Sequence, residues 1–558
     1  MIFYQLHIAK PTSQILEVTI SFETALKTTD CIFIPYYRPG RYQHASYEKN
    51  INCLTATDAN GENISLRRCD LNKWQPELDG ITRISYQYEC SRMDAGGSWI
   101  DDELVYLNFV NSLMMVEGRE SETINVEISY DKPIETIYPS RSTSLQYDNY
   151  FQLIDEPFIL SANSSTLAFE IDEIPFRIIT IGSLPLPEVD LANLFKKFSI
   201  AQKNVFGEFP FGYYDYIIFC NERTPYHGVE HANCTVITLP QDKSPEENLN
   251  SLLGISSHEL FHAWNVCRIR PQELWPYRLQ SPVIFDTGYA LEGFTTYYGD
   301  LMLVRSRVID LDAFLAELNL RLAQYFQFDG RHNASLQSSS RSLWANAYDR
   351  ASLEKEVSIY GKGMLASLTI DLFLRKSSEN QFSLDEVMKW LWRDFYLQNK
   401  PYSHADILQL MEKAGGKEAA ILFQKLVGST EPIENFLTEL LPFVGLQLKQ
   451  LNNNSKLIQH LGIVAQMDAD KLSIVKIFTE SQAYEELMRG DVLVSINNMA
   501  PSEYNGEQQV TVEVLRGNRN LKLAWTEKID SFGSYYEIQK MDQISEEHTT
   551  NMKMWIGV

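Results

Sequence analysis

The chain has 558 residues, of which 44% are hydrophobic and 22% are charged, and its formal net charge is -24. This length exceeds what a single hydrophobic core supports, and the composition excludes a disordered or fibrous protein. The negative charge disfavours a nucleic-acid surface and binding to anionic membranes, because both need clustered Lys and Arg. We therefore expect a globular protein of several domains, with no nucleic-acid or membrane partner.

The cysteines and the first residues of the chain indicate the cellular compartment in which the protein is expected. The seven cysteines are an odd number at low density and include no CxxC pair, which favours a reducing compartment over a disulfide framework. The start, MIFYQLHIAKPTSQ, lacks the basic and apolar segments of a signal peptide. No uninterrupted run of 18 apolar residues occurs, so no membrane span is expected. These features predict a cytoplasmic protein.

Short strands dominate the first part of the chain. Runs such as LEVTISFET and RISYQYEC alternate apolar and polar residues and are rich in β-branched and aromatic types, as in half-buried strands. Turn signals such as PGRY and ANGE separate these runs. Residues 1–170 are therefore predicted to form an all-β, sandwich-like domain.

Helices dominate the middle of the chain. Residues 171–305 combine buried strands at FRIITIG and YDYIIFCN with an amphipathic helix between them and further helices after them. Residues 306–440 continue with apolar residues at three- and four-residue spacing, which is typical of packed helices. A β segment returns over residues 441–528, and residues 529–558 are predicted to be a short polar tail. The fold class is multidomain α+β.

The segment HELFH contains two histidines four residues apart, His258 and His262. On a helix this spacing places both imidazoles on one face, where they can bind one metal ion. Glu259 lies beside the first histidine and can take a proton from a water molecule at the metal's open position. The alternative is a helix with unrelated histidines, and a chance match of this pattern has odds of roughly one in a hundred. We therefore predict a zinc site with a glutamate base.

A catalytic zinc site usually has three protein ligands, so one more is needed. Three acidic residues follow the motif: Glu273 in a proline-bounded loop, Asp286 at a plausible helix N-cap, and Glu292 among apolar and aromatic residues. A carboxylate buried on a helix needs a partner, which a metal supplies. Glu292 is the preferred candidate and Asp286 the alternative.

The longer stretch HELFHAWNVCRIRP, followed by LEGFTTYY, resembles the glycyl aminopeptidase family of zinc peptidases, which are of the gluzincin type. The resemblance implies that His258, His262 and Glu292 bind Zn²⁺ and that Glu259 is the general base. It also implies a thermolysin-like catalytic domain over residues 171–305 and a helical domain over residues 306–440 that completes the active site.

Two further segments fit the same family. YHGVEH resembles the family's Gly-x-x-Glu-His edge strand, with His227 in place of a glycine. By this resemblance Gly228, Val229, Glu230 and His231 bind the substrate, and Glu230 pairs with its α-ammonium group; without the resemblance, Glu230 would read as an exposed edge-strand residue.

SIYGKG resembles the family's Tyr-x-Lys-Gly signature, with Ile359 where a second tyrosine often stands. The resemblance implies that Tyr360 donates its hydroxyl to the oxyanion of the tetrahedral intermediate. A third segment, IPYYRPGRYQHASY, resembles the family's Pro-x-x-x-Pro-Gly-x-Tyr strand and turn. The similarity spans about four fifths of the chain.

Residues 441–528 resemble a PDZ domain, mainly at RGDVLVSINN. About a dozen residues separate Asn498 from the next predicted strand, and Pro501 and Gly506 are among them, so a two-turn helix barely fits there. We therefore expect a PDZ-like domain with a truncated groove wall that packs against the catalytic part instead of capturing free peptides.

These observations favour a zinc aminopeptidase that acts on peptides with a free N-terminus and, by family analogy, prefers glycine or alanine there. A zinc endopeptidase on the same site is the first alternative, and it would hold if Glu230 met no α-ammonium group. A catalytically inactive, PDZ-bearing peptide-binding protein is the second.

Overall fold

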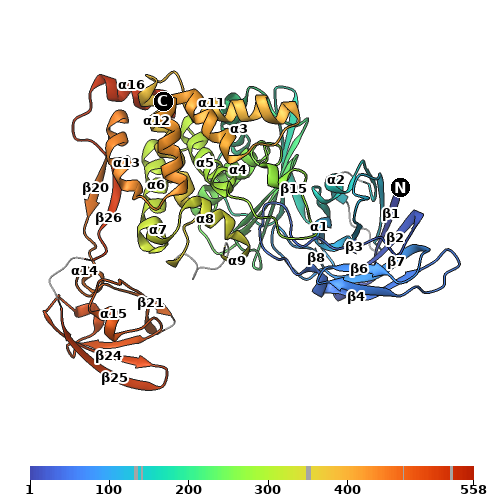
Figure 1. Ribbon diagram of the computed structural model, residues 1–558, viewed down its shortest axis with the longest axis horizontal. Helices are drawn as coiled ribbons and strands as arrows, with labels where there is room; N and C mark the ends of the chain where they lie inside the picture. Colours follow the sequence, from blue (N-terminus) through green and yellow to red (C-terminus); the bar gives the residue numbers. More distant parts are fainter. Residues whose placement is uncertain (131–135, 140–141, 347–353, 469, 528–531, 558) are drawn as a thin grey trace.

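The computed structural model describes residues 1–130, 136–139, 142–346, 354–468, 470–527 and 532–557 (Figure 1). A β-rich N-terminal region lies on one side of a central body of sheet and helices, and a small C-terminal lobe lies below the helices on the other side. The predicted multidomain α+β organisation with an N-terminal β region and a helical region is therefore confirmed.

Three sheets build the N-terminal region. In the largest, β1 runs parallel to β11 and antiparallel to β2, and alternate side chains along most of β2 are buried, as the pattern of LEVTISFET predicts. The six-stranded sheet has the order β13(Ser144–Tyr147), β11(Ile124–Tyr130), β1(Ile2–Ile8), β2(Ile15–Leu26), β7(Ile81–Glu89), β4(Ile51–Thr57). The two four-stranded sheets are β10(Met115–Val116), β3(Ile32–Phe33), β6(Lys73–Pro76), β5(Leu66–Asp70) and β12(Thr136–Tyr138), β14(Phe158–Ser161), β9(Leu104–Leu107), β8(Trp99–Ile100). Two short helices, α1(Phe109–Ser112) and α2(Tyr150–Ile154), connect them.

A five-stranded sheet forms one side of the central body. Its order is β15(Ser164–Ile171), β16(Ile174–Gly182), β17(Tyr214–Asn221), β19(Cys234–Pro240), β18(His227–Glu230). β16, β17 and β19 are parallel, whereas β18 runs antiparallel to β19 at the edge. β15 pairs with β16, so this sheet begins at Ser164.

Helices pack on this sheet and beside it. α10 lies at their centre, is buried along most of its length, and contacts α5, α6, α12 and α13. The helices are α3(Leu191–Phe206), α4(Pro245–His262), α5(Phe294–Arg305), α6(Leu311–Gln327), α7(Gly330–Asn333), α8(Leu336–Arg341), α9(Leu343–Asn346), α10(Gly361–Ser377), α11(Leu384–Trp390), α12(His404–Gly428) and α13(Ile433–Leu440).

The C-terminal end differs from the predicted polar tail. β26(Tyr535–Lys540) pairs with β20(Leu446–Leu451), and α16(Glu546–Ile556) returns to the central body. There the fully buried Trp555 donates its indole N–H to the Tyr297 hydroxyl at 2.8 Å, which ties α16 to α5. Residues 441–451 therefore belong to the central body, and the predicted boundary between 528 and 529 lies outside the described residues.

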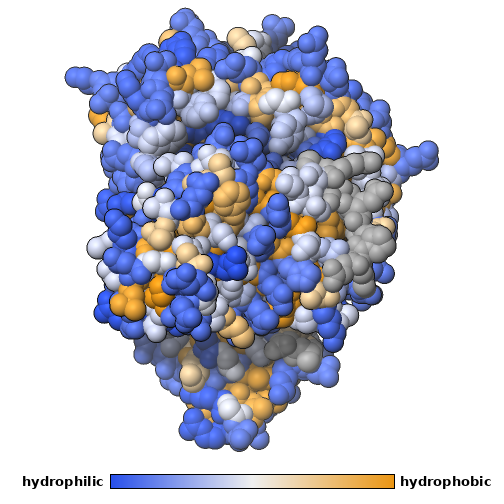
Figure 2. Space-filling view, turned by 90° about the vertical axis from the view of Figure 1, so that its right-hand side faces the viewer, coloured by the Kyte–Doolittle hydropathy of each residue, from blue (hydrophilic) through white to orange (hydrophobic). Residues whose placement is uncertain are grey.

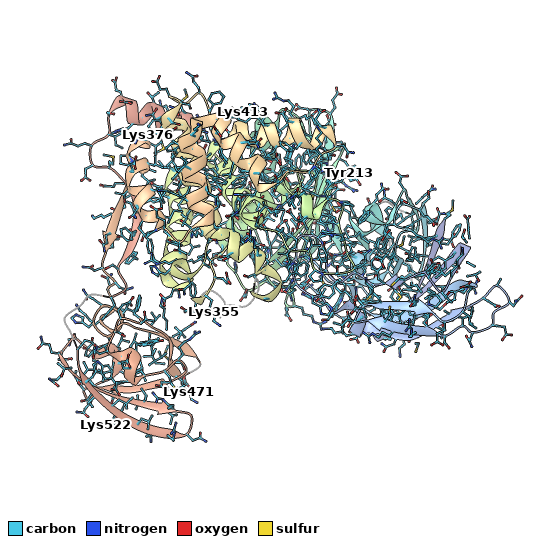
Figure 3. All side chains as sticks on the ribbon, in the orientation of Figure 1. Tyr213, Lys355, Lys376, Lys413, Lys471 and Lys522 are labelled. Carbon is cyan, nitrogen blue, oxygen red and sulfur yellow. The ribbon has the colours of Figure 1, made fainter. Side chains whose placement is uncertain are left out.

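The C-terminal lobe is inserted between β20 and β26 (Figure 1). It contains the sheet β21(Ile463–Asp468), β22(Lys471–Ile477), β23(Val492–Ile496), β24(Gln509–Arg516), β25(Arg519–Thr526) and the helices α14(Lys456–Leu461) and α15(Ala483–Glu486). Lys471 and Lys522 mark this lobe in Figure 3. Between β23 and β24 the chain forms a single 3-10 turn, Pro501–Glu503.

The outer surface of the N-terminal side shows scattered apolar patches between hydrophilic residues (Figure 2). Within the described ranges, the helices are too short or too polar to cross a membrane.

Candidate active site

The metal-binding motif lies at the end of α4. This helix begins with a reciprocal cap, in which the Ser244 hydroxyl accepts from the Glu247 N–H and the Glu247 carboxylate accepts from the Ser244 N–H. It ends at His262, so His258 and His262 lie one turn apart, and their Nε2 atoms are 3.1 Å from each other. Two nitrogen donors thus converge on one point, as the spacing predicts.

Glu292 reaches the same point from a π-helical turn, Tyr289–Gly293, that precedes α5. Its Oε2 lies 3.6 Å from His258 Nε2 and 3.3 Å from His262 Nε2. Among the described residues, this trio is the cluster of His, Cys, Asp or Glu side chains that could hold a metal ion. The other two candidates lie elsewhere: Asp286 accepts from Arg341 at 3.1 Å, and Glu273 accepts from Gln272 at 3.2 Å.

Close backbone packing brings these elements together. A Cβ atom on Gly293 would lie 2.6 Å from the Gly363 Cα, so only glycine lets the turn that carries Glu292 approach α10. A Cβ atom on Gly299 would lie 3.1 Å from the His258 Cα, where α5 crosses α4. The position of Glu292 beside the histidines therefore depends on small residues at both crossings.

The trio fits a divalent metal ion. The Oε2 atom of Glu292 is buried, and its nearest polar neighbours are the two histidine Nε2 atoms, at 3.3 and 3.6 Å. Two imidazoles and one carboxylate are the donor set of one class of catalytic zinc site, which leaves a fourth position for water or substrate. A cation among these three groups would be bound by all three donor atoms at once, and it would balance the charge of the buried carboxylate.

Asn265 positions the metal ligands from outside the trio, a role that no pattern in the sequence indicates. Its carbonyl lies 2.7 Å from His262 Nδ1, so that nitrogen donates and Nε2 is left free to bind a metal. Its side-chain amide donates to the Ala290 carbonyl at 2.8 Å and to the Thr295 hydroxyl at 3.1 Å. Asn265 thus joins the end of α4 to the turn that carries Glu292.

The charges in the site are strongly coupled. Burial alone would raise the pKa of Glu292, but His262 holds it well below its usual range. Burial alone would lower the pKa of His262, but Glu292 raises it. Burial raises the pKa of Glu259 to about 8, against the lowering effect of His262. Glu259 therefore exchanges a proton more readily near neutral pH than an exposed glutamate does.

The edge strand β18 passes directly over Glu259. A Cβ atom on Gly228 would lie 2.1 Å from Glu259 Oε1, so glycine is required for this approach. Glu230 lies two residues further along β18, against the Arg38–Arg41 turn, where Gly40 adopts a φ of 80° and a Cβ atom would lie 2.0 Å from Glu230 Oε1. The N-terminal region therefore forms one wall of the site.

Tyr360 stands at the N-terminal end of α10, and its ring centre is 6.5 Å from that of His258. A cleft of about 790 Å³ is lined by most of the predicted site residues: Gly228, Glu230, His258, Glu259, His262, Glu292 and Tyr360. Val229 and His231 do not line this cleft; they face a separate small cavity behind the strand.

Comparison with known proteins gives matches in both regions that build the site. Residues 3–162 match the model of the Peptidase M61 N-terminal domain, and residues 251–366 match that of the M61 glycyl aminopeptidase. No curated protein sequence matches the chain.

Among solved structures, an aminopeptidase N family protein from Idiomarina loihiensis is similar over 100% of both chains, with 21% identity and a TM-score of 0.88. An M1 zinc metallopeptidase from Deinococcus radiodurans is similar over 77% of this chain and 94% of its own, with 15% identity and a TM-score of 0.47.

The matching family models define a hydrolase that acts on peptide bonds. The chain belongs to the M61 glycyl aminopeptidase family, as its motifs predict.

Proposed function

We propose that the protein is a zinc-dependent aminopeptidase. The observation that carries this proposal is that the metal-binding trio lines one cleft together with Glu230, the last residue of the edge strand β18. The trio marks where the peptide bond is cut, and Glu230 offers a carboxylate to a free amino group a short distance away.

His258, His262 and Glu292 would hold the zinc ion. When bound, zinc supplies a Lewis acid that polarises the substrate carbonyl and makes water acidic enough to act as a nucleophile near neutral pH. Glu259 takes the proton of the attacking water and returns it to the nitrogen of the leaving amine. Tyr360 donates its hydroxyl to the carbonyl oxygen as negative charge develops there.

The substrate would lie along the free edge of β18, because an extended peptide can add to an exposed edge by backbone hydrogen bonds. In the described sheet β18 pairs only with β19, so the other edge of β18 faces the cleft. Glu230 would then bind the α-ammonium group and limit cleavage to the first residue. By family analogy this residue is small, with glycine and alanine preferred.

Blocking the substrate amine tests this proposal. We expect hydrolysis of Gly- and Ala-anilides, loss of nearly all activity on their N-acetyl forms, and loss of activity on chelation of the metal. The rate of anilide release with and without chelator is the measurement. Activity retained on N-acetylated substrates would favour a zinc endopeptidase. Absence of zinc from the purified protein would favour a catalytically inactive peptide-binding protein.

Replacing Tyr360 by phenylalanine should lower kcat by roughly 10²–10³, which is the typical effect of removing one oxyanion donor. KM should change little, because the hydroxyl acts in the transition state and the ring still packs near His258. Steady-state kinetics on an Ala-anilide measures both values. A larger change in KM than in kcat would mean that Tyr360 binds substrate instead.

We also infer that the C-terminal lobe is PDZ-like and serves as a packed domain. Lys476 of β22 is buried and donates to the Gln327 carbonyl at 2.6 Å and to Asp329 at 2.9 Å, which fixes the lobe to the end of α6. A free C-terminal peptide that bound this lobe tightly would contradict the inference.

The seven cysteines all have free thiols, which supports a reducing, cytoplasmic compartment.

A further inference from the structure

A groove that the proposed peptidase reaction does not use, which we call the α16 groove, lies between α16 and the segment that joins α5 to α6. Its volume is about 610 Å³, which is in the range of pockets that bind small molecules. Val304 and Val308 belong to its lining, as do Met552 and Ile556 of α16. Ile544, which is 51% exposed, lines it as well. The α16 groove therefore offers an apolar surface to a small ligand.

Basic side chains accompany this apolar surface. Arg307, Lys540 and Lys553 line the groove together with one aspartate, Asp310, which already accepts a hydrogen bond as the N-cap of α6. Lys540 pairs with Asp312 at 2.5 Å, whereas Arg307 and Lys553 are exposed and form no ion pair with a described residue. The whole chain has a net charge of -24, so a cluster of cations on an apolar groove is a local exception. Its charge complements an anionic ligand.

The backbone at Arg307 supports a role for its side chain. Arg307 follows the end of α5 with a φ of 58°, in the left-handed region where glycine is the usual residue after a helix. Its N–H donates to the Val304 carbonyl at 3.0 Å, which fixes this turn. A side chain in this region costs conformational free energy, and such outliers concentrate at functional sites. The chain therefore places a cation on the groove at a position where glycine would be less strained.

We propose that the α16 groove binds a long-chain carboxylic acid. The alkyl chain lies on the apolar lining, and the carboxylate lies at Arg307 and Lys553. Each fully buried methylene group strengthens binding by roughly fourfold, so the chain supplies most of the affinity. The two cations contribute less, because ion pairs that are exposed to solvent are weak. The groove therefore selects its ligand by chain length first and by negative charge second.

The α16 groove is separate from the metal site. Ile309 lines both the groove and the large cleft, so the two hollows adjoin through the segment that joins α5 to α6. The described lining of the groove includes none of the three metal ligands, His258, His262 and Glu292. A carboxylate in the groove is therefore held by the protein's own cations and not by the metal. The inference does not depend on the proposed peptidase activity.

Calorimetry of the zinc-loaded full chain with monomeric hexanoate, octanoate and decanoate tests the proposal. Decanoate should bind at least about tenfold more tightly than hexanoate, because it buries four more methylene groups. Decanol, which has the same chain without the charge, should bind about threefold to tenfold more weakly than decanoate. Absence of decanoate binding, no gain with chain length, or equal binding of decanol would overturn the proposal. Decanoate affinity should be the same after chelation of zinc, and its loss would mean that the acid binds the metal, which also overturns the proposal.

Charge reversal at the groove locates the site. The double variant Arg307→Glu/Lys553→Glu should weaken decanoate binding at least about tenfold. Its affinity for decanol should change less than about twofold, which shows that the groove is still folded. Lys10→Glu/Lys197→Glu, at two exposed positions outside the groove, is the matched control, because it changes the net charge equally and should keep the wild-type affinities. An unchanged decanoate affinity in the first variant, or an equal loss in both, would overturn the proposal.

Discussion

Replacing Glu259 by glutamine should abolish peptide hydrolysis while the protein keeps about one zinc ion per chain. Glutamine fills the same space beneath Gly228 but cannot accept a proton from water. Loss of general-base catalysis typically lowers the rate by about 10²–10⁴. Metal analysis of the purified variant, together with Ala-anilide kinetics, measures both parts of this expectation.

The control for this substitution lies on the same helix. Glu246 is exposed in the first turn of α4 and far along the chain from the motif, so Glu246→Gln should keep both zinc and activity. If Glu259→Gln lost zinc, the residue would hold the metal or its ligands in place, and its assignment as the base would be wrong.

Replacing Glu292 by glutamine should weaken zinc binding and abolish activity. The substitution removes the negative charge that faces both imidazoles at 3.3–3.6 Å and leaves two strong ligands. The loss of affinity should exceed the roughly 10–100-fold effect of changing an outer-shell partner. Competition with a chromophoric chelator measures the zinc affinity of wild type and variant under the same conditions.

Two further variants serve as references for the measurement of zinc affinity. Asn265→Ala removes the amide that joins the end of α4 to the turn carrying Glu292, and should lower zinc affinity by about 10–100-fold. Asp286→Asn changes the alternative ligand considered from the sequence, which instead pairs with Arg341, and should leave zinc affinity unchanged. Loss of zinc in Asp286→Asn but not in Glu292→Gln would reverse the assignment of the third ligand.

Much of this architecture can be predicted from local patterns in the sequence. The alternation in β2 and the apolar spacing of α10 follow from burial of one face or of the whole element, which the sequence displays directly. The two histidines of α4 share a face because helix geometry fixes their spacing. Glu292 could be selected because its apolar neighbours indicate burial, which a lone carboxylate avoids.

Other features depend on contacts between distant segments. α16 was predicted as a polar tail because its sequence, EEHTTNMKMWI, is mostly polar; its buried residues are Asn551, Trp555 and Ile556. Arg307 has no periodic or motif signal, and its place in the α16 groove depends on how α16 returns to the end of α5. Asn265 lies inside the conspicuous stretch HAWNV, but its role requires the position of the turn that carries Glu292.

The most direct test is an anomalous diffraction map at the zinc absorption edge, from crystals of the zinc-loaded protein. We expect one strong peak within about 2.0–2.2 Å of His258 Nε2, His262 Nε2 and a carboxylate oxygen of Glu292. A peak elsewhere, or a zinc ion held by the two histidines with Glu292 turned away from it, would contradict the account.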